Sequence, residues 1–191
     1  MQNVKILTGL KPFIIFALYF TCMSTPTENL NNQTDPKKDS KAPIRVMLAD
    51  DDKDDQHLFE EALDKTNVPT ELTTANNGQE LMDNLHDTSI PNPDVIFLDI
   101  NMPVKNGKDC LKEIKADEDL KDIPTVIYST SDNEKDINET FKAGANLYVS
   151  KPNSFSRIVS VLKYIFTLRW HKLFTRPDKK DFVVSEKSVP K

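Results

Sequence analysis

The stretch DVIFLDINMP, residues 94–103, joins a run of four apolar residues to a single aspartate, Asp99. A short apolar run bounded by polar residues and proline is typical of a strand that is buried on both faces. Three further runs have the same form and meet a polar side chain where they end: IRVMLA (44–49) before Asp50, PTVIYS (124–129) at Ser129, and LYVS (147–150) before Lys151. Because the carboxyl ends of parallel strands line up along one edge of an open sheet, we expect these side chains in one crevice.

Segments with helical spacing of apolar residues separate these strands, most clearly 54–66 and the long segment 154–171. Ser131 and Glu134 form a capping-box pattern that predicts the start of a further helix. A weaker strand, ELTTA (71–75), completes five strand–helix pairs. The sequence therefore predicts an α/β fold, a doubly wound (βα)5 domain whose five-stranded parallel sheet is covered by helices on both faces.

The chain divides into four parts: a hydrophobic N-terminal segment (1–24), a flexible linker (25–42), the folded domain (43–172) and a polar C-terminal tail (173–191). The linker has no apolar periodicity and many turn-forming residues. The tail is too short for a second domain.

Three alternatives remain open for the N-terminal segment. Its basic start and the apolar run 12–23 have the outline of a secretory signal. The same run could anchor the chain, although it is shorter than the roughly 20 residues of a membrane span. Alternatively, translation begins at Met23 and the segment is never made.

Charge and cysteine content exclude several classes of protein. The net charge of −5 combines +2 on residues 1–42 and +3 on residues 172–191, which leaves −10 on residues 43–171. An acidic domain without a basic stripe argues against nucleic-acid binding. The two cysteines, Cys22 and Cys110, predict neither a disulfide framework nor a metal knuckle.

Asp50, Asp51 and Asp52 form an acidic cluster where the first strand ends. A run of acids is often only a solvated helix start. Here the run follows a buried strand, so its first carboxylates should face the crevice, where crowded like charges require a cation. Mg²⁺ suits such a site because it accepts a few carboxylates and keeps several waters.

The other strand-end side chains are suited to phosphoryl chemistry. Asp99 could simply cap a loop, but beside an acidic cluster it is a candidate nucleophile, since carboxylates form aspartyl phosphates. Lys151, held between a strand and Pro152, could contact phosphoryl oxygens. Ser129 and Tyr148, taken alone, are an ordinary strand-end hydroxyl and a strand aromatic.

With these pieces in place, residues 43–172 resemble a response-regulator receiver domain of two-component signalling. The resemblance implies a flavodoxin-like fold with strand order 2-1-3-4-5. It implies that Asp99 is the phosphoacceptor, and that Asp50 and Asp51 hold Mg²⁺ together with Asp99 and the backbone carbonyl of Asn101. The sequence departs from the family pattern at Tyr128, a position where a smaller apolar residue is commoner.

By the same resemblance, Ser129 and Lys151 contact the phosphoryl group, and Tyr148 is the switch aromatic. Gly107 ends the loop after the acceptor, and the Lys151–Pro152 bond is cis. Phosphorylation draws in Ser129 and lets Tyr148 turn inward. This change alters a protein-binding face made by the fourth predicted helix, the strand 147–150 and the helix 154–171.

The implied phosphoryl donor is a phosphohistidine on a sensor or hybrid histidine kinase, or on a histidine phosphotransfer protein. The protein is then a phosphoprotein switch of a phosphorelay, not a metabolic enzyme, and is cytoplasmic. Retention of residues 12–23 would add association with the inner membrane. The helix ending in LRW (168–170) resembles that of stand-alone receivers that dimerise, which implies a homodimer as one state.

Two other functions remain open. A haloacid-dehalogenase-type phosphatase uses the same residue types, but its order is nucleophile, hydroxyl, lysine, then acids, and it needs an acid where this chain has Asn101. A scaffold that is never phosphorylated is the second alternative.

Overall fold

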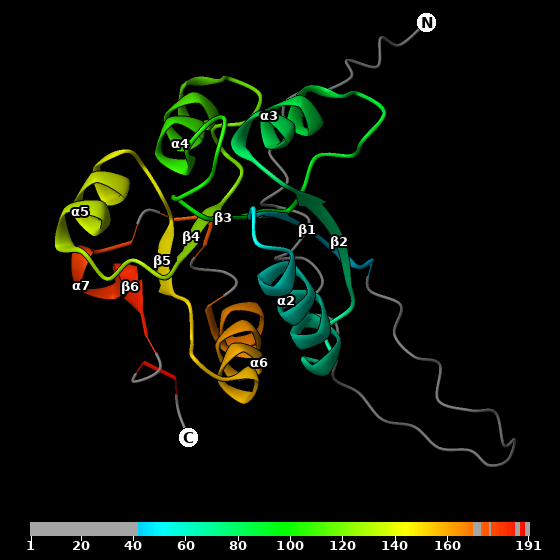
Figure 1. Ribbon diagram of the computed structural model, residues 1–191, viewed down its shortest axis with the longest axis vertical. Coiled ribbons are helices and arrows are strands. Elements are labelled where there is room, and N and C mark those ends of the chain that lie inside the picture. Colours follow the sequence, from blue (N-terminus) through cyan, green and yellow to red (C-terminus); the bar gives the residue numbers. More distant parts are fainter. Residues whose placement is uncertain (1–41, 170–172, 176, 186–187, 190–191) are drawn as a thin grey trace, which may run out of the picture. The chain divides into compact units, whose positions relative to one another are not determined.

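The computed structural model describes residues 42–169, 173–175, 177–185 and 188–189 (Figure 1). The predictions for the N-terminal segment 1–24, and for the linker 25–42 except its last residue, fall outside these residues. No helix in the described part of the chain is long and apolar enough to cross a membrane.

The sheet has six parallel strands in the order β2-β1-β3-β4-β5-β6. The strands are β1 (Ile44–Ala49), β2 (Thr70–Ala75), β3 (Val95–Leu98), β4 (Thr125–Ser129), β5 (Leu147–Ser150) and β6 (Val183–Val184). The predicted order of the first five strands, 2-1-3-4-5, is confirmed, whereas the prediction of a five-stranded sheet missed β6.

Helices cover both faces of the sheet, as a doubly wound fold requires. They are α2 (Lys53–Lys65), α3 (Gly78–His86), α4 (Gly107–Ala116), α5 (Glu134–Lys142), α6 (Phe155–Tyr164), the π-helical turn η1 (Ile165–Arg169) and the short α7 (Lys179–Phe182). Helices α3, α4 and α5 lie on one face, and α2 and α6 lie side by side on the other (Figure 1).

The buried side chains divide between two apolar clusters because neighbours along a strand point to opposite faces. In β3, Ile96 and Leu98 pack beneath α3 and α4. Val95 and Phe97 pack beneath α2 and α6. All four are completely buried, which explains why this strand is a continuous apolar run and not an alternating one.

Tyr128 fits the second cluster despite its size. Its ring packs edge-to-face on Phe59 (5.3 Å between centroids) and on Phe97 (6.3 Å). Such aromatic pairs add to the stabilisation that burial alone provides.

The capping-box prediction at Ser131 is wrong. Helix α5 begins at Glu134, and Asn133 is the N-cap residue, whose side chain accepts a hydrogen bond from the backbone N–H of Lys135. Ser131 instead donates its hydroxyl to Asp136 over 2.7 Å. Asn is as good a cap as Ser, so local sequence does not choose between them.

The C-terminal region also differs from the expected polar tail. Leu173, Phe182 and Val184 are buried, with at most 2% of their surface exposed. Phe182 ends α7 and Val184 lies in β6, which pairs with β5. The apolar run is only three residues long, between Asp181 and Ser185, and is too short for any periodic pattern to identify it.

Candidate functional site

Backbone hydrogen bonds hold the predicted site residues at one edge of the sheet. Asp99 N–H donates to the carbonyl of Ala49 (2.9 Å), and Lys151 N–H donates to the carbonyl of Ser129 (2.8 Å). The Asp50 N–H donates in the same way to the carbonyl of Ala75 in β2 (3.0 Å). These bonds extend the ladders one residue past the strands, so the side chains that follow the apolar runs have fixed positions.

Asp50, Asp51 and Asp99 form the acidic cluster of this edge. One carboxylate oxygen from each lies within 4.8 Å of the others. Asp50 and Asp99 are buried, at 1% and 7% exposure, whereas Asp51 is exposed. Burial raises the pKa of Asp50 above its ordinary value, against the opposing effect of its hydrogen bond with Lys151. Hard oxygen ligands, partly buried and open on one side, suit a small divalent cation that keeps some of its waters.

Asp52 does not join the cluster. Its carboxylate accepts hydrogen bonds from the backbone N–H groups of Asp54 and Asp55 and so caps α2. The carboxylates of the acidic run therefore have different roles. Asp50 and Asp51 face the crevice, and Asp52 stabilises the start of a helix.

Lys151 lies at the centre of the acidic residues. Its Nζ donates to Asp50 (2.7 Å) and Asp55 (2.8 Å) and lies 3.5 Å from an Asp99 oxygen. Its side chain is only 7% exposed. Burial lowers the pKa of Lys151, but the hydrogen bonds to Asp50 and Asp55 outweigh burial and raise it. The amine is therefore charged at neutral pH, and it also lies 5.5 Å from the centre of the Tyr128 ring.

Asp55 is a partner of Lys151 that sequence reasoning did not single out. It lies in the first turn of α2, where an acid is common for helix-dipole reasons alone. The sequence held no signal to distinguish it from its neighbours.

The backbone around Lys151 departs from one expectation. No cis peptide bond occurs among the described residues, so the Lys151–Pro152 bond is trans, where the resemblance implied cis.

The loop after Asp99 approaches the aspartate closely. The backbone N–H of Asn101 donates to Asp99 Oδ1 (3.3 Å). A Cβ at Gly107 would lie 2.0 Å from the Asp99 carbonyl oxygen, so only glycine fits there. The N–H of Gly107 donates to the carbonyl of Ile100 (3.1 Å) and closes the loop.

Ser129 and Tyr148 lie on β4 and β5 and are completely buried. The Ser129 hydroxyl oxygen accepts a long hydrogen bond from the N–H of Ser131 (3.4 Å). The Tyr148 hydroxyl donates to the carbonyl of Ser131 (2.8 Å). The segment after β4 therefore touches both side chains, and Tyr148 has its ring inside the protein.

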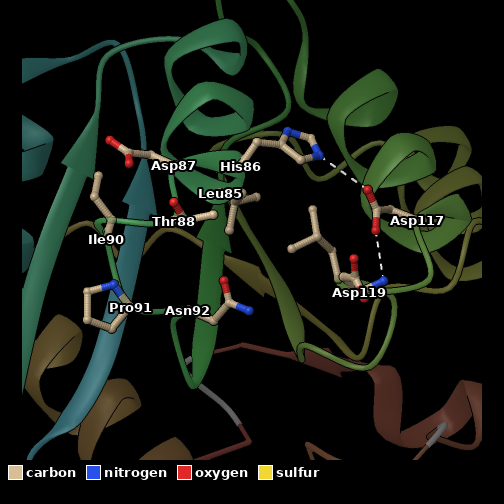
Figure 2. A pocket seen from close by; sticks show the side chains of 10 residues that line it. Leu85, His86, Asp87, Thr88, Ile90, Pro91, Asn92, Asp117 and Asp119 are labelled. Atoms are coloured by element: carbon tan, nitrogen blue, oxygen red, sulfur yellow. Dashed lines mark hydrogen bonds and ion pairs between the residues drawn. The ribbon is translucent and has the colours of Figure 1, made fainter.

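A separate cavity of about 500 Å³ lies between the connection from α3 to β3 and the connection from α4 to β4 (Figure 2). Leu85, Ile90 and Leu120 form part of its wall, and His86 pairs with Asp117 at its rim (3.2 Å). This cavity is at the amino ends of β3 and β4, whereas the acidic cluster is at their carboxyl ends. It therefore takes no part in the site.

The fold and the site together define a class of protein: a parallel α/β domain with a buried aspartate, a neighbouring pair of aspartates and a buried lysine at the carboxyl edge of its sheet. Comparison with known proteins agrees. Residues 46–163 match the family described as the response regulator receiver domain, and the chain belongs to this family.

Two relatives illustrate the match. Response regulator Rcp1 of Synechocystis sp. is 32% identical over 143 residues, which are 73% of this chain and 97% of that protein. The crystal structure of the phosphorylated cyanobacterial phytochrome response regulator RcpA has a TM-score of 0.64 and 37% identity, and the match covers 72% of this chain and all of RcpA.

A solved structure of the Mn²⁺-bound form of Rcp1 has a TM-score of 0.62 and 31% identity, and the match covers 71% of this chain and all of that one. The acidic cluster of this chain is consistent with the divalent ion that receiver domains bind.

The chain is thus a phosphorylation-dependent response regulator of two-component signalling. Receiver domains accept phosphoryl groups from histidine kinases and bind downstream targets, and they are generally not metabolic enzymes.

Proposed function

We propose that Asp99 is the phosphoacceptor, and that Asp50, Asp51, Asp99 and the backbone carbonyl of Asn101 hold Mg²⁺. The observation that supports this proposal is the contact of one buried lysine, Lys151, with Asp50 and Asp99 within an acidic cluster. A candidate nucleophile, a cation and carboxylates that could bind a metal ion are thus close together at this edge. Bound Mg²⁺ would supply positive charge to the oxygens of the transferring group.

In the proposed reaction, a carboxylate oxygen of Asp99 attacks the phosphorus of a phosphohistidine on the partner. The new O–P bond forms as the P–N bond breaks, and the imidazole leaves with the electron pair of that bond. The chain itself contributes positioning and electrostatic stabilisation. The loop closed by Gly107 fixes the backbone of Asp99 while this happens.

Lys151 has two partners in succession. Before transfer it offsets the charges of Asp50 and Asp55. After transfer the phosphoryl oxygens offer a stronger, charge-assisted contact close to Asp99. A Lys ammonium on a flexible stem can move between them, which a shorter or fixed cation could not do.

The acyl phosphate would draw in the Ser129 hydroxyl, and the vacated space would favour the inward, buried position of the Tyr148 ring. Both side chains contact the segment at Ser131 that leads into α5. The change would reach the face formed by α5, β5 and α6. A local charge event would thus bias a surface with two states, and that surface would bind a protein partner.

For the phosphoryl donor we propose a sensor or hybrid histidine kinase or a histidine phosphotransfer protein. The −10 charge of residues 43–171 is unfavourable for nucleic acid, so the proposed output is protein binding, with a homodimer as one form. The only reaction that the chain would catalyse is its own phosphorylation and dephosphorylation.

The test is the intact mass of the full chain after incubation with acetyl phosphate and Mg²⁺. The wild type should gain one phosphoryl group. No gain is expected without Mg²⁺, and none is expected in the Asp99→Asn variant. If Asp99→Asn also gained a phosphoryl group, Asp99 would not be the acceptor. Steady turnover of p-nitrophenyl phosphate would favour a haloacid-dehalogenase-type phosphatase, and no adduct from any donor would favour a scaffold.

A further inference from the structure

The segment Asp178–Val184, called the strap below, covers the outer edge of β5. Helix α7 leads directly into β6, which pairs in parallel with β5 in the register Tyr148–Val183 and Val149–Val184. In Figure 1 the red strand β6 follows the edge of the yellow strand β5, with α7 close to α5. Without the strap, the backbone groups of β5 would be open to pairing with another chain.

One aromatic side chain anchors the strap. Phe182 is completely buried, and its ring lies 5.1 Å from the ring of Phe141 in α5 and 6.1 Å from the ring of Tyr148. Two positions later, Val184 is buried in the apolar cluster on the other face of the sheet. The strap therefore packs on both faces of the sheet beside β5. The contacts of Phe182 with α5 and β5 are on the face proposed to change with phosphorylation.

Tyr148 is held from two sides. The carbonyl of Ser131 accepts a hydrogen bond from the Tyr148 hydroxyl, and Phe182 packs against the Tyr148 ring. An outward rotation of the ring would break both contacts and would open a cavity beside Phe182, which costs free energy in a close-packed interior. The buried position of Tyr148 and the docked position of the strap thus support each other.

We propose that the strap is an internal ligand of the β5 edge that holds Tyr148 in its buried position. This inference rests on the proposed function, in which phosphorylation of Asp99 favours the buried Tyr148. Because coupling between two events is reciprocal, phosphorylation then tightens docking of the strap. The surface shown to partners by the phosphorylated protein includes α7 and β6, and the bare β5 edge is closed to strand addition.

Hydrogen exchange of the full chain tests the strap directly, with Phe182→Ala compared with the wild type. We expect amides of residues 179–184 and of β5 to exchange at least about tenfold faster in Phe182→Ala, since local opening sets exchange rates. Phe174→Ala is the matched control, because Phe174 lies in the same C-terminal region with 46% of its surface exposed. Unchanged protection of β1 would show that Phe182→Ala still folds.

The coupling is tested by adding beryllofluoride, a phosphoryl mimic, with Mg²⁺. Exchange of residues 179–184 should slow in the wild type and stay unchanged in Asp99→Asn. Equal exchange in Phe182→Ala and Phe174→Ala would overturn the strap. Faster exchange of residues 179–184 with the mimic would overturn the coupling. If the protection of residues 179–184 from exchange fell on dilution of the protein, the strand paired with β5 would come from a second copy of the chain, and the strap would be overturned as an internal ligand.

Failure of this inference is distinguishable from failure of the proposed function. If the wild type takes up the phosphoryl group in the mass measurement and residues 179–184 do not respond to beryllofluoride, only the coupling is wrong. If Phe182→Ala loosens β5 but no phosphoryl group is ever taken up, the strap stands as a structural element and the proposed phosphoacceptor is wrong.

Discussion

The hydroxyl of Tyr148 donates a hydrogen bond to the backbone carbonyl of Ser131 across 2.8 Å. Ser131 donates its own hydroxyl to Asp136 (2.7 Å), and Asp136 pairs with Lys108 (2.5 Å) at the start of α4. Since Lys108 directly follows Gly107, polar contacts run from the loop after Asp99 to the proposed switch residue. This series links two elements that are far apart in the sequence.

The first prediction concerns this hydroxyl. Tyr148→Phe keeps the ring but leaves the partly buried Ser131 carbonyl without its donor, so the free energy of unfolding should fall by about 1 kcal/mol. Urea denaturation measures it.

Tyr128→Phe is the matched control, because the described residues offer no hydrogen-bond partner to the Tyr128 hydroxyl, which is also buried. Its stability should be unchanged or higher. Equal losses in both variants would mean that the Tyr148 hydrogen bond contributes nothing to stability.

The second prediction concerns the metal. Saturating Mg²⁺ should raise the free energy of unfolding of the wild type, by about 2.7 kcal/mol at a hundredfold excess over Kd. Asp50→Asn should lose most of this increase because Asp50 is a proposed ligand. Asp64→Asn, an exposed change elsewhere in α2, should retain it. An equal Mg²⁺ response in all three proteins would place the ion elsewhere.

The third prediction concerns Lys151. Lys151→Ala removes the cation that contacts Asp50 and Asp99, and an uncompensated buried charge typically costs about 3–5 kcal/mol. Without Mg²⁺ we expect a loss near the lower end, since Asp50 can take up a proton. Lys163→Ala, at an exposed position of α6, should change stability by less than about 0.5 kcal/mol.

Phosphorylation gives Lys151 a second readout. The Lys151→Ala variant should be phosphorylated by acetyl phosphate far more slowly than the wild type, while Lys163→Ala should match the wild type. A Lys151→Ala protein that is destabilised but phosphorylated at the normal rate would limit this lysine to a structural role.

The fourth prediction concerns Gly107. A methyl group there would meet the Asp99 carbonyl oxygen, so Gly107→Ala should shift the acceptor loop and cost about 2–3 kcal/mol. Gly144→Ala is a useful comparison, because Gly144 has a φ of +98° but its Cβ would meet only the Lys115 side chain at 3.4 Å. Both variants should lose stability, but only Gly107→Ala should lose phosphorylation.

The fifth prediction concerns pH and His86. Its two ring nitrogens face the Asp117 carboxylate and the carbonyl of Met82, two acceptors that only the imidazolium can satisfy together. The hydrogen bond to Asp117 therefore raises the pKa of His86 above its ordinary value. Because the folded protein binds this proton more tightly, the stabilisation is complete below pH about 6.5 and is lost as pH rises through the raised pKa.

NMR titration of the His86 ring, with Asp117→Asn for comparison, checks the cause of this shift. The variant should return the pKa of His86 towards its ordinary value, while Asn at position 117 can still accept the backbone hydrogen bond from residue 119. An unchanged pKa in Asp117→Asn would remove Asp117 as its cause.

Some features could be predicted because their signal is local. The run 95–98 is apolar at every position, and its short length and flanking proline favour a strand buried on both faces. Asp99 and Lys151 directly follow such runs, so the general rule for parallel sheets was enough to bring them together.

Other features had no local signal. Asp55 and Asp52 are equivalent acids at a helix start, yet one contacts Lys151 and the other caps the helix. Ser131 and Asn133 are both good caps, but the Asn133 side chain accepts from the backbone N–H of Lys135, whereas the Ser131 hydroxyl donates to the Asp136 side chain.

The alternation of strands and helices, and the chemistry at each strand end, could be predicted because hydrophobic periodicity and residue type are properties of short segments. The packing of Phe182 against Tyr148, and the addition of β6 to the sheet by this charged tail, became visible only in the folded protein. The reason is physical: a three-residue apolar run gains little by itself, but the open edge of β5 and the space beside Phe141 give it hydrogen bonds and a place to be buried.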